Sequence, residues 1–225
     1  MYRNTMKAII FDMDGVLVDS EPHHVKIEKK LFAKRGLEIS DQEHSKYMGK
    51  ATDVMWKEII ADKKLPFNIK QLVEQTVIES KKHFSLQKKL KAMPGLESLL
   101  IKFSKKGIPM AVASSSGQEI IDILLKLTGL KKYFSFTVSS ELVGGSKPEP
   151  DIFLYTARLL SVKPEECLVI EDSTNGIRAA KAANMFCVAY NGTSVNQQDQ
   201  KLADIQINDY SELEKIVVKY LNVDL

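Results

Sequence analysis

The chain has 225 residues, of which 44% are hydrophobic and 27% charged, and its formal net charge at pH 7 is +3. This composition is typical of a folded globular protein and excludes a disordered, collagen-like or low-complexity chain. The charge is too near balance for a nucleic-acid-binding surface, and no apolar run approaches the roughly 20 residues of a membrane span, so we expect neither kind of partner. Cys167 and Cys187 each lie in an apolar run, which indicates buried thiols and a cytoplasmic location.

The chain opens with a predicted strand at residues 8–11, an apolar run that ends abruptly at Asp12 and Asp14. Such a run is typical of a strand that is buried on both faces of a parallel sheet. The next stretch, residues 20–89, contains no convincing strand but several amphipathic helical patterns. We therefore expect an all-helical cap domain, inserted after the first strand and placed over the edge of the sheet where ligands bind.

After residue 89 the pattern alternates between helices and strands. Apolar residues repeat at helical spacing in residues 96–103, 120–125 and 213–221, and continuous apolar runs occupy residues 109–113, 167–170 and 185–189. Ser211, with Glu214 three residues later, is the expected N-cap of the last helix. The alternation predicts an α/β fold with a doubly wound (Rossmann-like) parallel sheet, whose core domain comprises residues 1–19 and 90–225.

Polar side chains follow the predicted strands at the points where the strands end. They are Asp12 and Asp14, then Ser114, Ser115 and Ser116, then Glu171 and Asp172, with Lys147 in a loop before Pro148. In an open α/β sheet the carboxyl ends of the strands converge on one crevice. Carboxylates gathered there would repel one another, which implies a hard divalent cation, most simply Mg²⁺. Hydroxyls and a lysine beside that cation indicate a site for a phosphoryl group.

Four segments, in this order, resemble the motifs of the haloacid dehalogenase (HAD) superfamily. They are Asp12-Met13-Asp14-Gly15 continuing to Ser20, then Ser114, then Lys147-Pro148 with Pro150-Asp151, and finally Glu171-Asp172-Ser173 with Gly176. The long gap after the first segment is similar to the subfamily with a helical cap there, which includes sugar-phosphate phosphatases and β-phosphoglucomutase. Four ordered motifs are a far more specific signal than any one of them alone.

The resemblance implies a role for each matching residue. Asp12 would attack phosphorus and form an aspartyl-phosphate, while Asp14 would protonate the leaving oxygen and later activate water. The implied Mg²⁺ ligands are Asp12, Asp14 through its backbone carbonyl, Asp172, and Glu171, which would orient Lys147 or a metal-bound water. The implied phosphate-binding residues are Ser114, Ser115 and Lys147.

The expected activity is that of a Mg²⁺-dependent phosphatase that acts on a small phosphorylated metabolite such as a sugar phosphate. The alternative is a β-phosphoglucomutase-type sugar-phosphate mutase. His24 resembles a cap histidine of the mutase in its offset from Asp12, although His23 and His24 are equally compatible with a helix surface. Thr52 stands where the mutase has a phosphate-binding arginine, which favours hydrolysis, and Lys50 is the nearby cation that can substitute for it. Because the implied catalytic residues are all present, a binding protein on an inactive scaffold is disfavoured. We expect a monomer, since the cap already covers the crevice.

Overall fold

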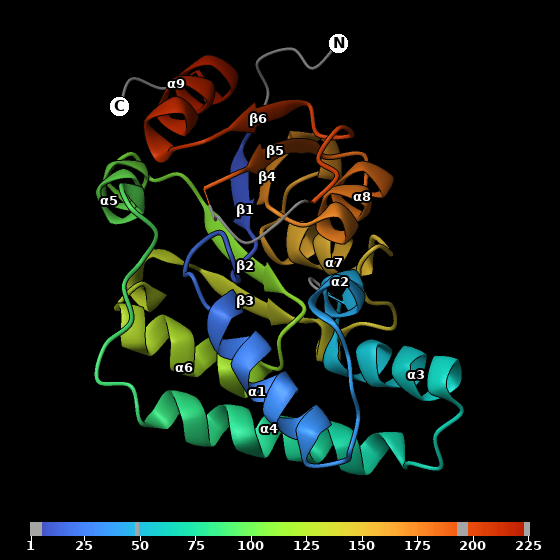
Figure 1. The fold of residues 1–225 in the computed structure, drawn as a ribbon. Helices are drawn as coiled ribbons and strands as arrows, with labels where there is room; N and C mark the ends of the chain where they lie inside the picture. The colour runs from blue at the N-terminus through green and yellow to red at the C-terminus, as the bar shows by residue number, and fades with distance from the viewer. Residues whose placement is uncertain (1–5, 48–49, 193–197, 223–225) are drawn as a thin grey trace.

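The computed structural model describes residues 6–47, 50–192 and 198–222, and the rest of the predicted core and cap lies outside these described residues. Among them a six-stranded parallel sheet forms the centre of the molecule (Figure 1). Its strands are β1 (Ala8–Phe11), β2 (Met110–Ser114), β3 (Phe136–Ser139), β4 (Cys167–Glu171), β5 (Phe186–Tyr190) and β6 (Ile205–Ile207). Their order in space is β3-β2-β1-β4-β5-β6, which confirms the predicted Rossmann-like sheet.

The predicted strands are the inner four of this sheet. All residues of β1, β2, β4 and β5 are buried, because helices cover both faces of a parallel sheet. The edge strand β3 has no counterpart among the predicted strands. Its first residue, Phe136, is exposed and the second is half-buried, so β3 lacks the continuous apolar run that marks an inner strand.

Two groups of helices sandwich the sheet (Figure 1). They are α5 (Leu96–Lys105), α6 (Gln118–Thr128) and α9 (Tyr210–Leu221) on one face, and α7 (Asp151–Leu159) and α8 (Thr174–Ala182) on the other. Each face of the sheet packs against its helices in a separate hydrophobic core, and successive residues of β1 point to opposite faces. Ile9 and Phe11 pack with the first group of helices, and Ile10 packs with the second. The three helices predicted after residue 89 are thereby confirmed.

The predicted start of the last helix was wrong. Helix α9 begins at Tyr210, and its N-cap is Asp209 instead of Ser211. The Asp209 carboxylate accepts a hydrogen bond from the backbone N–H of Ser211 at 2.8 Å, and Glu212 accepts one from the N–H of Asp209 at 3.4 Å. The capping box therefore lies two residues earlier, because Asp209 already supplies an acceptor for the free N–H groups of the first turn.

The described elements between β1 and α5 are all helical, as the sequence predicts for the cap. Its helices are α1 (Glu21–Ala33), α2 (Asp41–His44), α3 (Thr52–Lys63) and α4 (Ile69–Ser85). Trp56 is buried in its centre, where the indole Nε1 donates a hydrogen bond to Thr76 Oγ1 at 2.9 Å. The cap touches the core where α4 packs on α6, and Lys81 forms an ion pair with Glu119 across that contact. None of the described helices is both long and apolar enough to cross a membrane.

Candidate active site

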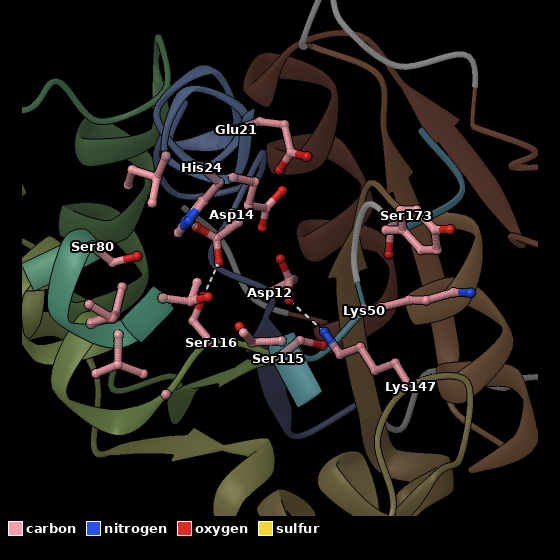
Figure 2. Close-up of a pocket in the computed structure, with 18 of the residues that line it drawn as sticks. Asp12, Asp14, Glu21, His24, Lys50, Ser80, Ser115, Ser116, Lys147 and Ser173 are labelled. Atoms are coloured by element: carbon pink, nitrogen blue, oxygen red, sulfur yellow. Dashed lines mark hydrogen bonds and ion pairs between the residues drawn. The ribbon is translucent and has the colours of Figure 1, made fainter. Parts of the chain in front are cut away.

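A pocket lies between the carboxyl ends of the central strands and the cap helices α1 and α4 (Figure 2). The core contributes Asp12 and Asp14 from the loop after β1 and Ser115 from the turn after β2. The pocket is lined by seven of the nine predicted site residues: Asp12, Asp14, His24, Lys50, Ser115, Lys147 and Asp172. Ser114 and Glu171, the other two, are fully buried directly behind it.

Lys147 is the central cation of the core side. Its side chain is only 2% exposed, and Nζ donates hydrogen bonds to Asp12 Oδ1 at 2.5 Å, Glu171 Oε1 at 2.6 Å and the Ala113 carbonyl at 3.1 Å. Burial alone would lower the pKa of Lys147, but the charges of Asp12 and Glu171 raise it above its ordinary value. Lys147 is therefore a fixed positive charge that joins the ends of β1 and β4.

Glu171 is held rigidly behind Lys147. Its Oε2 accepts hydrogen bonds from the backbone N–H groups of Asp172 and Ser173, both at 2.9 Å, and from the Ser173 hydroxyl at 3.0 Å. The backbone of Gly176 passes so close that a Cβ atom there would lie 1.6 Å from Glu171 Oε1. Any side chain at position 176 would therefore collide with the Glu171 carboxylate, which explains why the fourth motif has a glycine there.

Three buried carboxylates form a cluster that fits a metal ion. Asp12, Glu171 and Asp172 each offer an oxygen within 4.8 Å of the others. Burial raises the pKa of Asp172 well above its ordinary value, and the charges of Glu171 and Asp12 raise it further. Burial also raises the pKa of Asp12, although Lys147 opposes the shift. Hard oxygen donors with excess negative charge are the ligands that Mg²⁺ prefers.

The loop after β1 adapts its backbone to this cluster. Gly15 has a φ of +80°, and a Cβ atom there would lie 2.1 Å from Asp172 Oδ2. Glycine therefore allows the loop that carries Asp14 to approach Asp172 directly. The side chain of Asp14 does not join the cluster. Its predicted metal contact runs through the backbone carbonyl and stays a prediction.

Asp14 instead joins the core to the cap. Its Oδ1 accepts hydrogen bonds from His24 Nε2 at 3.0 Å and from the Ser20 hydroxyl, and its Oδ2 accepts from Ser116 Oγ at 2.9 Å and Ser114 Oγ at 3.3 Å. The predicted phosphate-binding hydroxyl of Ser114 is thus directed at Asp14. No separate role is predicted for the Ser20 hydroxyl, whereas Ser116 belongs to the run of three serines, starting at the last residue of β2, that is predicted at the phosphoryl site.

Asp14 and His24 share one proton at neutral pH. Burial alone would raise the pKa of Asp14, but the charge of His24 and the hydrogen bonds to it lower that pKa to about 2. In the same way, burial would lower the pKa of His24, but the Asp14 carboxylate raises it to about 9. The proton therefore resides on the imidazole, and a charged hydrogen bond ties α1 to the loop after β1.

The remaining cap residues divide into those that face the pocket and those that do not. His24 faces it, whereas His23 lies 2.7 Å from His83, between ring nitrogens, and does not line the pocket. The Lys50 ammonium donates to both carboxylate oxygens of Glu58, at 2.8 and 2.6 Å, and Figure 2 shows it directed away from Asp12. Glu21, which the sequence did not single out, also lines the pocket.

Comparisons with known proteins agree on one family. A model of haloacid dehalogenase-like hydrolases matches residues 9–190. Among relatives in Escherichia coli K12, fructose-1-phosphate phosphatase YqaB is 34% identical over 182 residues, covering 80% of this chain and 94% of the relative. Hexitol phosphatase B of the same organism is 31% identical over 213 residues, covering 92% and 93%.

Solved structures and longer relatives complete the comparison. The crystal structure of β-phosphoglucomutase from Clostridium difficile superposes with a TM-score of 0.84 at 30% identity, covering 96% of this chain and 98% of that one. The chain also matches two longer proteins of Arabidopsis thaliana, of which it spans only 18% and 55% of the length.

Proposed function

The chain belongs to the family of haloacid dehalogenase-like hydrolases, and from this premise we propose that it is a Mg²⁺-dependent phosphatase of a small sugar phosphate. The observation that carries the proposal is the position of the Asp12 carboxylate, which accepts a hydrogen bond from the Lys147 ammonium and belongs to the buried acidic cluster that lines the core side of the pocket. When Mg²⁺ is bound, this carboxylate lies beside two positive charges, the ion and Lys147. It is then a competent nucleophile toward a phosphoryl group that the same two charges bind.

The proposed reaction has two steps. An oxygen of Asp12 attacks phosphorus, the bond between phosphorus and the ester oxygen breaks, and an aspartyl-phosphate forms. The leaving oxygen takes a proton through Asp14, which draws that proton from the protonated His24 imidazole along their hydrogen bond. Water then attacks the aspartyl-phosphate, Asp14 accepts a proton from that water, and inorganic phosphate leaves while the Asp12 carboxylate is restored.

The surrounding residues position and neutralise the phosphoryl group. Lys147 and Ser115 bind its oxygens, and Ser114 supports Asp14 from behind. Mg²⁺ would be held by Asp12, the Asp14 carbonyl and Asp172, with Glu171 anchoring Lys147 beside them. When bound, the ion supplies positive charge that favours the ionised form of Asp12 and offsets the charge on the phosphoryl oxygens.

Hydrolysis is a better proposal than the mutase reaction. A mutase must hold its bisphosphorylated intermediate by a second phosphate, which calls for a free cation on the cap side of the pocket. In the described part of the pocket Lys50 is paired with Glu58, and the neighbouring Thr52 is uncharged. Two relatives similar over nearly their whole length are named phosphatases, which supports the same choice.

The proposal includes the domain division, the cellular location and the oligomeric state of the enzyme. We assign residues 20–89 to a cap domain that closes over the substrate and excludes water while phosphoryl transfer takes place. Residues 1–19 and 90–225 form the core domain, and the enzyme acts on a small phosphorylated metabolite as a cytoplasmic monomer.

The test is phosphate release from a panel of sugar phosphates with Mg²⁺, including β-glucose 1-phosphate with a coupled readout for glucose 6-phosphate. We expect release of inorganic phosphate that a chelator stops and that Asp12→Asn abolishes. Asp62→Asn, which changes an exposed aspartate of α3, is the matched control and should leave the rate unchanged. Formation of glucose 6-phosphate without net phosphate release would overturn the proposal in favour of the mutase.

A further inference from the structure

Besides His24, the cap side of the pocket carries polar side chains for which the phosphatase reaction has no use. Glu21, His24 and Glu28 are spaced by three and four residues on α1, so they share one face of the helix, and all three line the pocket. Ser80 lines it from α4. Figure 2 shows Glu21 on the α1 side and Ser80 on the α4 side of the space in front of Asp12.

Glu21 and Ser80 differ from Glu28 and His24 in that their side chains have no hydrogen-bond or ion-pair partner among the described residues. One oxygen of Glu28 accepts a hydrogen bond from His44 Nε2 at 2.5 Å. Within residues 6–47, 50–192 and 198–222, by contrast, no group forms a hydrogen bond or ion pair with the Glu21 carboxylate or the Ser80 hydroxyl. Both side chains are therefore able to bond to whatever fills the pocket.

The cations that line the described pocket are all engaged by protein carboxylates. Lys147 binds Asp12 and Glu171, His24 binds Asp14, and Lys50 binds Glu58. Burial raises the pKa of Glu21 to about 7, and the neighbouring charges of Asp14 and Glu28 contribute to this shift, although His24 opposes it. Glu21 is thus a cap-side carboxylate that no cation of the described residues pairs with, and at pH 8 most of it is ionised.

We propose that Glu21 and Ser80 select the substrate by the part that is remote from the phosphate: they bind the hydroxyls of an uncharged polyol chain, and Glu21 repels substrates that carry a second anion there. The inference rests on the proposed function for the placement of the phosphate beside Asp12. A carboxylate accepts hydrogen bonds from hydroxyl groups, whereas a carboxylate or phosphate of the ligand would face the half-buried Glu21 as a like charge. Selectivity of this kind arises from the repulsive element as much as from the attractive one.

The first experiment measures binding without turnover. In an Asp12→Asn background at pH 8 with Mg²⁺, calorimetry compares glucitol 6-phosphate with 6-phosphogluconate, which differ at one end as an alcohol and a carboxylate. We expect the alcohol to bind at least about tenfold more tightly. Equal affinities, a preference for the carboxylate, or no binding of either ligand would overturn the inference.

Variants in the same background identify the residues responsible. Glu21→Gln keeps the size of the side chain and removes its charge, so the ratio of the two affinities should fall by about tenfold. Ser80→Ala should weaken binding of the alcohol by about fivefold. Glu74→Gln, at an exposed glutamate of α4 outside the pocket, is the matched control and should leave both affinities unchanged. An unchanged ratio in Glu21→Gln, with a native circular dichroism spectrum, would refute the role of this residue.

Turnover by the unmodified enzyme separates this inference from the proposed function. Release of phosphate from glucitol 6-phosphate and from 6-phosphogluconate with similar kcat/KM would refute the selectivity while the phosphatase assignment stands. A binding preference in the Asp12→Asn protein without phosphate release by the unmodified enzyme would refute the assignment and leave the selectivity in place.

Discussion

Replacement of Lys147 by methionine tests the buried charge network of the core. Methionine is close to lysine in length and lacks its charge, so the change removes the cation with little change in packing. The lysine is 2% exposed and makes ion pairs with Asp12 and Glu171 at 2.5 and 2.6 Å. Removal of one partner from a buried ion pair leaves the others uncompensated, and costs about 3–5 kcal/mol of unfolding free energy. We expect a loss of this size in metal-free protein at pH 8.

The loss should depend on pH in a definite direction. Without Lys147, the pKa values of Asp12 and Asp172, which burial already raises in the native protein, are raised further in the folded state. The folded variant then binds more protons than the unfolded chain, so its stability falls as pH rises, by up to about 1.4 kcal/mol per pH unit for each proton. The difference from the unmodified protein should therefore be smaller at pH 5 than at pH 8.

The assay is urea unfolding followed by circular dichroism in the presence of a chelator, at both pH values. The matched control is Lys102→Met, because Lys102 also pairs with a glutamate, Glu214, but its side chain is 45% exposed. Exposed ion pairs contribute about 1 kcal/mol at most, so this variant should be nearly as stable as the unmodified protein. A Lys147→Met variant that loses no more than Lys102→Met at pH 8 would refute the reasoning.

Three further changes test other parts of the site. Asp12→Asn should lower the rate of phosphate release by at least about 10⁴-fold without lowering the melting temperature of metal-free protein, since it removes one of several clustered carboxylates; residual turnover within tenfold of normal would contradict a nucleophilic role. His24→Gln should be less stable than the unmodified protein by up to about 3 kcal/mol below pH 6.5, because folding raises the pKa of His24 from 6.5 to about 9. Urea unfolding at a series of pH values should show this difference in stability disappear as the pH rises through 9. Gly176→Ala should lower the free energy of unfolding by about 1–3 kcal/mol and remove most of the activity, because the new Cβ displaces Glu171. The control is Gly144→Ala, whose Cβ meets nothing within 4 Å, and it should leave both the stability and the activity near normal.

Much of the fold follows from local patterns in the sequence. The four inner strands are continuous apolar runs because both of their faces are buried, and the acids and hydroxyls that follow them share one end of a parallel sheet by the geometry of that sheet. The sequence patterns are weaker at the edge of the sheet and at the ends of helices. Phe136 in β3 is exposed, so no apolar run marks that strand, and Asp209 and Ser211 are both competent caps that only the helix geometry distinguishes.

The sequence by itself determined the architecture, the helical insertion and the residues that gather at the strand ends, because each of these depends on periodicity or on motif order. The tertiary structure decided which side chains pair. Lys147 meets Asp12 across 135 positions of the chain and Ser116 meets Asp14 across 102, while Lys50 lines the pocket with its ammonium bound to Glu58. Such pairings depend on how loops and helices that are distant in the chain are oriented against one another, and on competition among several carboxylates for a few cations, and no local pattern encodes either.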